Sequence, residues 1–199
     1  MILRKRKHPP RESSEARNAL VDAAVRIVND EDRQFDARSV AKEAGRSLGT
    51  LTHHFRDGGL QELRGAVALR GFHMLSEAVR AELAEAGDAE KCLRRIALTY
   101  ARFALKHPRL YRTMFGDEWG EAVKEAQGAL RAIVAEQVAR CQRDGILRPG
   151  PAERIARSGQ ALLHGIALMQ LEGQVPAEDA ESFAKEAIDD LFDGLRARD

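Results

Sequence analysis

Apolar residues recur every three or four positions along almost the whole chain, which is the period of an amphipathic helix. In the first third of the sequence this pattern predicts three short helices. Serine or aspartate side chains, which accept hydrogen bonds from free backbone amides, are expected to begin them, and a glycine is expected to end the second. The expected caps are Ser13 or Ser14, then Asp36, then Ser47, and the terminating glycine is Gly45.

From Leu60 onward the predicted helices become longer. Glycine, proline and aspartate residues separate them, and no segment shows the alternation of apolar and polar residues that is typical of a half-buried strand. The pattern therefore predicts an all-α fold of about nine helices, three short ones followed by six that are mostly longer. The six later helices are expected at about 60–85, 89–107, 108–115, 118–143, 152–171 and 177–196.

The helix pattern divides the chain into three parts. Residues 1–12 hold two prolines and the basic run Arg4-Lys5-Arg6-Lys7, which indicates a flexible basic arm. Residues 13–58 form a small three-helix domain, and residues 59–199 form a larger helical domain. Two interpretations of the arm stand side by side: it is a solvated tail, or it reaches the phosphates or the minor groove of DNA.

Charge and composition narrow the class of protein. The net charge is +1, but residues 1–56 hold 12 Lys and Arg against 8 Asp and Glu, so the N-terminal part is the basic one. No apolar run is long enough to cross a bilayer, and polar residues follow the basic N-terminus where a signal peptide has its apolar core. Cys92 and Cys141 lie far apart without metal-type spacing, as expected for inert thiols in a reducing compartment. We therefore expect a cytoplasmic protein with no membrane partner.

The second and third predicted helices have the build of a helix-turn-helix. Small Ala41 and Ala44 let the two helices approach closely, and Gly45 makes the turn between them. Leu51 and Phe55 are four residues apart and share the face that packs on the first helix. The opposite face of the third helix is then free to enter the major groove of DNA. The residues expected to contact DNA are Arg38, Arg46, Ser47, Leu48, Gly49, Thr50, Thr52, His53, His54 and Arg56.

Residues 14–63 resemble the DNA-binding domain of the tetracycline-repressor (TetR-like) family. The resemblance rests on Val40-Ala41, Ala44-Gly45, Ser47, Gly49-Thr50-Leu51, His54-Phe55 and Leu60. In the larger domain, residues 100–104, 107–111 and 164–165 look like recurrent motifs of a C-terminal class of this family, the Trp-His-Gly type. Three positions differ from the family pattern: Thr52 stands where the family usually has a phosphate-binding Tyr, Gly58 stands where it often has a Lys, and Arg46 stands where the residue is usually apolar.

The resemblance implies a ligand-responsive transcription regulator, usually a repressor. It implies a homodimer. The broad apolar faces of the last two long helices also predict an interface there, with Ile166 and Leu191 near its centre. The resemblance also implies a double-stranded DNA operator that is released when a small, largely apolar effector binds the larger domain. The candidate effector contacts are Tyr100, Phe103, Tyr111, Met114, Phe115, Trp119, His164 and Met169. Some of these are expected in ordinary core, and for His164 a satisfied core or interface position is the other interpretation.

Other classes of protein fit the sequence less well. No phosphate-binding loop, nucleophile elbow or zinc-helix motif occurs, so we expect no catalytic site, cofactor or metal. Adjacent helical side chains point about 100° apart, so His53 and His54 are not expected to chelate one ion. The rival interpretations are a helical-bundle carrier or enzyme that keeps a vestigial helix-turn-helix, and a DNA-binding protein without an effector.

Overall fold

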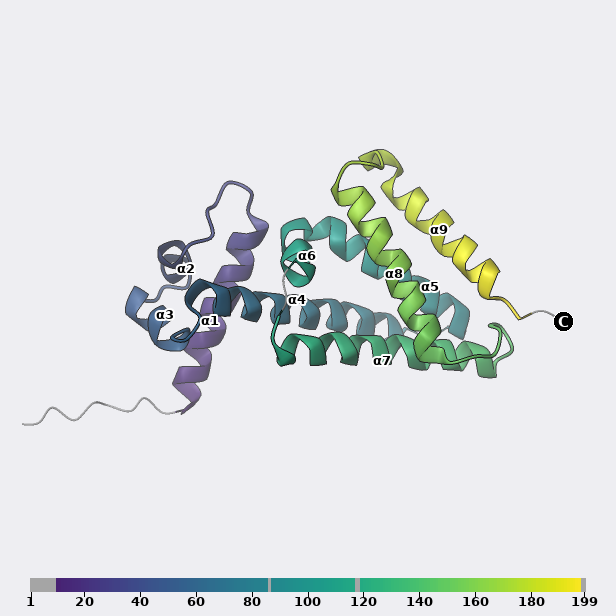
Figure 1. Cartoon of the computed structure of the whole chain (residues 1–199), viewed down its shortest axis with the longest axis horizontal. Helices are drawn as coiled ribbons and strands as arrows, with labels where there is room; N and C mark the ends of the chain where they lie inside the picture. The colour runs from purple at the N-terminus through teal and green to yellow at the C-terminus, as the bar shows by residue number, and fades with distance from the viewer. Residues whose placement is uncertain (1–9, 86, 117–118, 198–199) are drawn as a thin grey trace, which may run out of the picture.

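The computed structural model describes residues 10–85, 87–116 and 119–197, and within these ranges the chain is all-α, which confirms the predicted fold class (Figure 1). One short 3-10 helix, Ala177–Asp179, and one isolated antiparallel bridge between Leu147 and Arg196 complete the regular structure of the described ranges. The α-helices are α1 (Pro10–Asn29), α2 (Ala37–Glu43), α3 (Leu48–His54), α4 (Gly59–Ala84), α5 (Ala89–Lys106), α6 (Pro108–Phe115), α7 (Glu121–Arg143), α8 (Ala152–Leu171) and α9 (Ala180–Leu195).

Helix α1 begins earlier than the sequence pattern predicts. It starts at Pro10, so the predicted capping by Ser13 or Ser14 is wrong, and both serines lie inside the helix. Proline suits a first helical position, because its fixed φ already fits the helix and the amide it lacks would have no partner there. Residues 10–12 therefore belong to α1 rather than to the predicted basic arm. The basic run of that arm, residues 4–7, lies outside the described residues.

The other predicted helix signals of the small domain are confirmed. The Asp36 carboxylate accepts a hydrogen bond from the amide of Arg38 (2.8 Å) at the start of α2. The Ser47 hydroxyl accepts one from the amide of Thr50 (3.1 Å) at the start of α3. Gly45 has a φ of 62°, a left-handed conformation that favours glycine, and it turns the chain between α2 and α3. Local chemistry thus places the helix-turn-helix where the sequence predicts it.

One apolar core holds the three short helices together. Leu20 and Ile27 of α1, Val40 of α2, and Leu51 and Phe55 from α3 and its C-terminal cap are each at most 3% exposed. The face of α3 that carries Leu51 therefore packs inward, and the opposite face lies at the surface of the small domain.

Helix α4 joins the small domain to the large one. Figure 1 shows it running from beside α1–α3 into the helical bundle, where α7 lies alongside it. Its buried residues extend from Leu63 near its first turns to Val79 near its last turns, so this one helix packs against both parts of the chain.

Two helix starts in the large domain differ from the prediction. Helix α7 begins at Glu121, after Gly120, rather than at residue 118. Helix α9 begins at Ala180 rather than at residue 177, because a 3-10 turn follows the extended backbone of Pro176. Such tight turns are frequent at helix ends. The spacing of apolar residues that predicts a helix does not tell a preceding 3-10 turn from the first turn of the α-helix.

Gly71 sets how closely α6 approaches α4. A Cβ at this position would lie 2.6 Å from the Sδ of Met114 and 3.2 Å from the Cδ1 of Leu110, and both of those side chains are fully buried. We expect Gly71→Val to lower the free energy of unfolding by about 1–3 kcal/mol, because overpacking forces neighbours out of their preferred rotamers. Chemical denaturation measures the change. The matched control is Gly128→Val on α7, where a Cβ meets no atom within 4 Å; an equal loss in both variants would contradict the steric reason.

Candidate functional site

The exposed side of α3, together with the turn before it and the start of α2, collects most of the residues predicted to contact DNA. Eight of the ten are exposed: Arg38, Arg46, Ser47, Leu48, Gly49, Thr52, His53 and Arg56. Thr50 and His54 are half-buried. Leu48 is 44% exposed, so this face presents an apolar side chain beside hydroxyl, imidazole and guanidinium groups. These are the kinds of group that contact base edges and phosphates.

Some polar groups on this face already have partners within it. The Thr52 hydroxyl donates to the backbone carbonyl of Leu48 (3.0 Å), so its proton is engaged inside α3. The Arg56 guanidinium donates to Nδ1 of His53 (2.7 Å). Because arginine has no acceptor atom, His53 accepts through Nδ1 and carries its ring proton on Nε2. His53 therefore presents an N–H donor at the surface of α3.

Two arginines balance an acidic side chain beside this face. The Glu43 carboxylate, at the end of α2, pairs with Arg26 and with Arg33, each at 2.8 Å. Hydrogen bonds from Arg26 and Arg33 lower the pKa of Glu43. Within the described part of the chain, Arg46 and Arg56 form no ion pair, so their guanidinium groups remain available to an external anion.

The start of α4 gives a local reason for glycine at position 58. A Cβ on Gly58 would lie 2.9 Å from the Cβ of Glu62 and 3.3 Å from its backbone nitrogen. The next residue, Gly59, has a φ of 53°, which also favours glycine. A lysine at position 58 would therefore require the first turn of α4 to shift.

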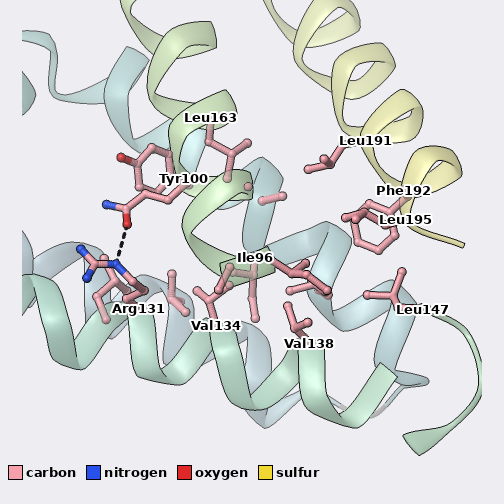
Figure 2. A pocket seen from close by; sticks show the side chains of 18 residues that line it. Ile96, Tyr100, Arg131, Val134, Val138, Leu147, Leu163, Leu191, Phe192 and Leu195 are labelled. Atoms are coloured by element: carbon pink, nitrogen blue, oxygen red, sulfur yellow. Dashed lines mark hydrogen bonds between the residues drawn. The ribbon is translucent and has the colours of Figure 1, made fainter. Parts of the chain in front are cut away.

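A narrow apolar cavity lies in the large domain between α5, α7, α8 and α9 (Figure 2). Its volume is about 70 Å³, which is well below the roughly 300–1,000 Å³ of typical ligand pockets. A larger ligand therefore requires the surrounding helices to separate. The apolar lining residues are Val79, Leu93, Ile96, Ala97, Leu130, Val134, Val138, Leu147, Ile155, Ala156, Gly159, Leu163, Leu191, Phe192 and Leu195.

Polar side chains gather at one end of this cavity. Figure 2 shows Arg131 and Tyr100 at that end, whereas Leu147 and Leu195 lie at the other. The Arg131 Nε donates to Oε1 of Gln160 (3.1 Å). The cavity thus combines a long apolar wall with a cationic end.

The predicted effector contacts do not all reach the cavity. Tyr100 lines it. Tyr111, Phe115 and His164 form an aromatic cluster beside it, with ring centroids 4.8 Å apart for Tyr111 and Phe115 and 4.7 Å apart for Phe115 and His164. The cluster fills the space between α6 and α8, so it forms core behind the polar end of the cavity.

The other four predicted contacts lie elsewhere among the described residues. Met114 is fully buried against α4, and Phe103 packs on the ring of His107 with centroids 4.9 Å apart. The Trp119 indole donates to the carbonyl of Thr113 (2.9 Å). Met169 is 38% exposed on the outside of α8. None of these four side chains lines the apolar cavity.

Sequence reasoning missed Arg131 and Gln160. The available signal was the position of Arg131, three residues before Val134 and seven before Val138, which places it on the inward face of α7. Gln160 lies three residues before Leu163 on α8, again on the cavity side. A polar residue within an apolar stripe is the pattern that predicts the polar end of a buried site.

A chain of hydrogen bonds connects the cavity wall with α6 and α8. The hydroxyls of Tyr100 and Tyr111 are 3.0 Å apart, and the Tyr111 hydroxyl is 2.7 Å from Nδ1 of His164. Burial raises the pKa of Tyr100 to about 12, raises that of Tyr111 further, and lowers the pKa of His164. All three groups are therefore neutral at pH 7. Two residues before Tyr111 on α6, Arg109 donates to the carbonyl of Asp30 (2.7 Å) just after α1, so α6 also touches the small domain.

Thermal stability is expected to fall as the pH drops below about 6.5. Burial is the main cause that lowers the pKa of His54, His107 and His164 from the ordinary value of 6.5. Each histidine binds its proton more weakly in the folded than in the unfolded chain. Its contribution to stability is therefore complete above the unfolded pKa and is lost as the pH falls toward the folded pKa. Unfolding midpoints measured between about pH 7.5 and 5.5 test this expectation.

We expect His164→Gln to flatten that pH profile, because glutamine keeps a hydrogen-bond acceptor for Tyr111 without a titrating group. The control is His73→Gln, since His73 is exposed on α4. A His164→Gln profile as steep as that of the unmodified protein would contradict a contribution of His164 to the pH dependence.

The residues of α8 and α9 that are predicted for the centre of a dimer interface lie inside the single chain. Ile166 is 3% exposed and belongs to the core, and Leu191 lines the cavity. The prediction that Ile166 faces a partner is therefore wrong, whereas the prediction for Leu191, which is half-buried, stays a prediction. Both helices carry apolar residues on more than one side, and the helical period alone does not tell which side faces the chain's own core.

A different stripe of small and apolar residues lies on the outer surface of α8 and α9. Gly165 is exposed, and a Cβ there meets no atom within 4 Å, so the side of α8 around it is open. The residues that are exposed or half-buried on this side, at helical spacing, are Ala161, Leu162, Gly165, Leu168 and Met169 on α8, with Phe183, Ala187 and Gly194 on α9.

Other kinds of site are not evident in the described part of the chain. No three or more His, Cys, Asp and Glu side chains of the described ranges are grouped so that they could hold a metal ion. No helix formed by these residues has both the length and the apolar character needed to cross a lipid bilayer. Burial raises the pKa of Cys141 to about 11, so this thiol stays protonated at pH 7.

Comparisons with known proteins bear on both domains. Residues 93–191 match a family model described as "Tetracyclin repressor-like, C-terminal domain". No curated protein matches the sequence. Among solved structures, the chain is similar to a protein with unknown function from Rhodococcus sp. RHA1, with 29% identity over 97% of this chain and 99% of that chain and a TM-score of 0.78.

Two solved regulators share the fold over nearly the whole chain. A TetR-family transcriptional regulator from Pectobacterium atrosepticum is 19% identical over 96% of this chain and 99% of that chain, with a TM-score of 0.77. A TetR family transcription regulator from Marinobacter aquaeolei VT8 is 21% identical over 96% of this chain and 100% of that chain, with a TM-score of 0.67. The structural likeness covers the helix-turn-helix and the helical bundle together, and the family model identifies the bundle from its sequence. The chain therefore has the fold of TetR-like transcription regulators, and residues 93–191 match the C-terminal domain of that family.

Proposed function

We propose that this protein binds double-stranded DNA as a homodimer through α2 and α3, and that it releases the DNA when a small, largely apolar molecule enters the cavity of the large domain. The exposed face of α3 carries the proposal. The inward face of α3 is occupied by the core residues Leu51 and Phe55. The outward face presents Leu48, His53 and Arg56, which are not needed for that core.

The side chains of α3 suit the reading of a major groove. His53 offers an N–H donor from Nε2, which can bind a guanine or adenine acceptor or a phosphate oxygen. Leu48 and the methyl group of Thr52 can contact the methyl group of thymine. Arg46 and Arg56, without acidic partners in the described ranges, suit phosphates on either side of the groove. In this assignment the hydroxyl of Thr52 stays bonded to its own helix and supplies no phosphate contact.

Two copies of α3 must be held at a fixed spacing to read one operator. Half-sites one turn of DNA apart require recognition helices about 34–36 Å apart. The open stripe on α8 and α9 is the surface that we assign to dimerisation. Its small residues, Ala161 and Gly165, allow close crossing of two helices, and Met169 and Phe183 supply apolar area.

Release of the DNA follows from the size and surroundings of the cavity. A ligand larger than about 70 Å³ fits only when the helices around the cavity separate. It therefore favours an expanded conformation over the compact one, which is a shift of population. Val79 of α4 lines the cavity, so its expansion displaces the helix that carries the small domain. Helix α6, through Tyr111 and Arg109, gives a second connection to the end of α1.

The proposed DNA contacts are tested by fluorescence anisotropy with the DNA that lies upstream of the gene. We expect His53→Ala to weaken binding by about 10- to 100-fold, since one good base contact contributes about 1–3 kcal/mol of discrimination. Thr52→Ala is expected to have a smaller effect, because its hydroxyl is engaged by Leu48. His73→Ala, on the exposed side of α4, is the control. Unchanged binding of His53→Ala, or an unfolded His53→Ala protein, would contradict the assigned face.

A further inference from the structure

The cavity of the large domain has a cationic end that its own protein does not neutralise. Arg131 bonds through Nε to Gln160, and no carboxylate within the described ranges pairs with its guanidinium. The remaining N–H groups of Arg131 therefore have no protein acceptor among the described residues. Every other lining residue apart from Tyr100 and Gln160 is apolar. A guanidinium beside an apolar slot is stabilised when a ligand supplies the missing anion.

We propose that the effector is an amphipathic carboxylate, with a slender hydrocarbon chain along the apolar wall and a terminal carboxylate bound by Arg131. This inference rests on the proposed function, because it assumes that the cavity is the effector site. It adds the chemical class of the effector and the orientation in which it binds.

The groups at the polar end favour an anion over a neutral or cationic head. Arginine presents a planar fork of donors that matches the two oxygens of a carboxylate. Oε1 of Gln160 already accepts from Arg131, and the Gln160 side chain also hydrogen-bonds to the Tyr100 hydroxyl, so the guanidinium of Arg131 is the group left to bind a ligand head. A cationic head would be repelled by Arg131, and a neutral hydroxyl would leave the guanidinium without a counter-charge.

The dimensions of the slot favour an unbranched chain. Its volume is about 70 Å³, which is less than an eight-carbon chain occupies, so the apolar side chains of α5, α7, α8 and α9 that border it have to move apart even for a slender ligand, and a slender ligand moves them least. From Arg131 to Val138 the wall follows about 10 Å of the α7 axis. Since three bonds of an extended chain span about 3.5 Å, this length corresponds to roughly eight or nine bonds, which is about the length of an eight-carbon carboxylate from its methyl carbon to a carboxylate oxygen. A fused-ring ligand would need a much wider opening between the helices.

The far end of the slot limits the length of that chain. Leu147 and Leu195 line the cavity there. Leu147 also bridges to Arg196, and the amide of Arg148 donates to the carbonyl of Leu195 (2.9 Å), so the end of α9 is tied to the loop after α7. A chain of about eight carbons reaches this closed end, and a much longer one has to break the bridge.

Isothermal titration calorimetry on the full chain tests the proposal with octanoate, octan-1-ol and butanoate as probes. We expect octanoate to bind about ten-fold or more tightly than octan-1-ol, because only octanoate pairs with the guanidinium. Butanoate is expected to bind far more weakly, because it leaves most of the apolar wall uncovered. Arg131→Gln is expected to remove the preference for octanoate over octan-1-ol.

Two further variants locate the site. Arg140→Gln, on the same helix but exposed and away from the cavity, should keep the preference for octanoate. Gly159→Leu should abolish binding of both eight-carbon probes, because Gly159 lines the cavity and its added side chain would occupy the slot toward Leu191. Circular dichroism of each variant shows whether it is folded.

The outcomes separate this inference from the proposed function. Equal affinity for octanoate and octan-1-ol, a preference that persists in Arg131→Gln, or no binding of octanoate would overturn the carboxylate assignment. In each of these cases operator binding, measured separately by anisotropy, would still support the proposed regulator. A chain that binds octanoate through Arg131 but shows no affinity for any upstream DNA would instead refute the proposed function.

Discussion

Gly165→Glu is expected to separate the proposed dimer and to abolish tight operator binding. Gly165 is exposed on α8, and a side chain there meets no atom within 4 Å of its Cβ, so the single chain has room for the larger residue. In the proposed interface the two introduced carboxylates would approach each other across a two-fold axis. Burying an unpaired charge costs several kcal/mol, and a two-fold interface contains two such charges, one from each subunit. Operator affinity should fall by about 100-fold or more, since about 2.8 kcal/mol already corresponds to that ratio.

The oligomeric state is measured by sedimentation equilibrium at micromolar concentration. Gly128→Glu, on α7, is the matched control: it also places a carboxylate at a mid-helix glycine with open space around its Cβ. We expect this control to remain dimeric and to bind DNA. A Gly165→Glu protein that stays dimeric would place the interface elsewhere. An unfolded Gly165→Glu protein would contradict the exposure of this face.

Local features of the helix-turn-helix could be predicted because a few neighbouring residues determine them. Asp36 and Ser47 accept hydrogen bonds from backbone amides that lie only two or three residues further along the chain. Gly45 adopts the left-handed conformation of the turn between α2 and α3, which depends on that one residue. The start of α1 could not be predicted in the same way. Ser13 and Pro10 are both residues that suit a helix start, and α1 begins at Pro10, which gives the longer of the two helices.

The cavity could not be predicted from local rules, because its parts come from distant segments. Arg131 and Gln160 are 29 residues apart and meet only when α7 packs on α8. Aromatic residues that the sequence predicts as effector contacts, such as Tyr111 and Phe115, fill core beside the cavity instead of lining it. Composition identifies which side chains are large and apolar, but the packing of α5 to α9 decides which of them border a free space.

The same limit applies to the faces of α8. Ile166 and Gly165 are neighbours in sequence, yet Ile166 is 3% exposed and Gly165 lies at the surface. Adjacent helical positions point about 100° apart, so an apolar helix with two candidate faces needs its packing partners to be known before its inner side can be assigned. For α3 the inner face could be assigned from the sequence, because Leu51 and Phe55 together form its one large apolar face.

Phe55→Ala is expected to eliminate DNA binding by unfolding the small domain. The Phe55 ring is 1% exposed, packs in the core of α1–α3 and lies 5.0 Å from the Arg17 guanidinium. Removing a buried Phe side chain costs about 3–5 kcal/mol. The part of the core around Phe55 is small, so a loss of this size is a large fraction of what holds α1–α3 in place. Far-UV circular dichroism should therefore show the loss of helix in the folded temperature range, together with the loss of operator binding.

His53→Ala separates this effect from the loss of a DNA contact. His53 is exposed on the opposite face of α3, so its replacement should change the free energy of unfolding by less than about 0.5 kcal/mol. The two variants are therefore expected to weaken the same operator complex for different reasons, Phe55→Ala with loss of helix and His53→Ala without it. Retained operator binding in Phe55→Ala would mean that the packing of α3 on α1 does not position the recognition surface, and DNA binding would then have to be assigned to another part of the chain.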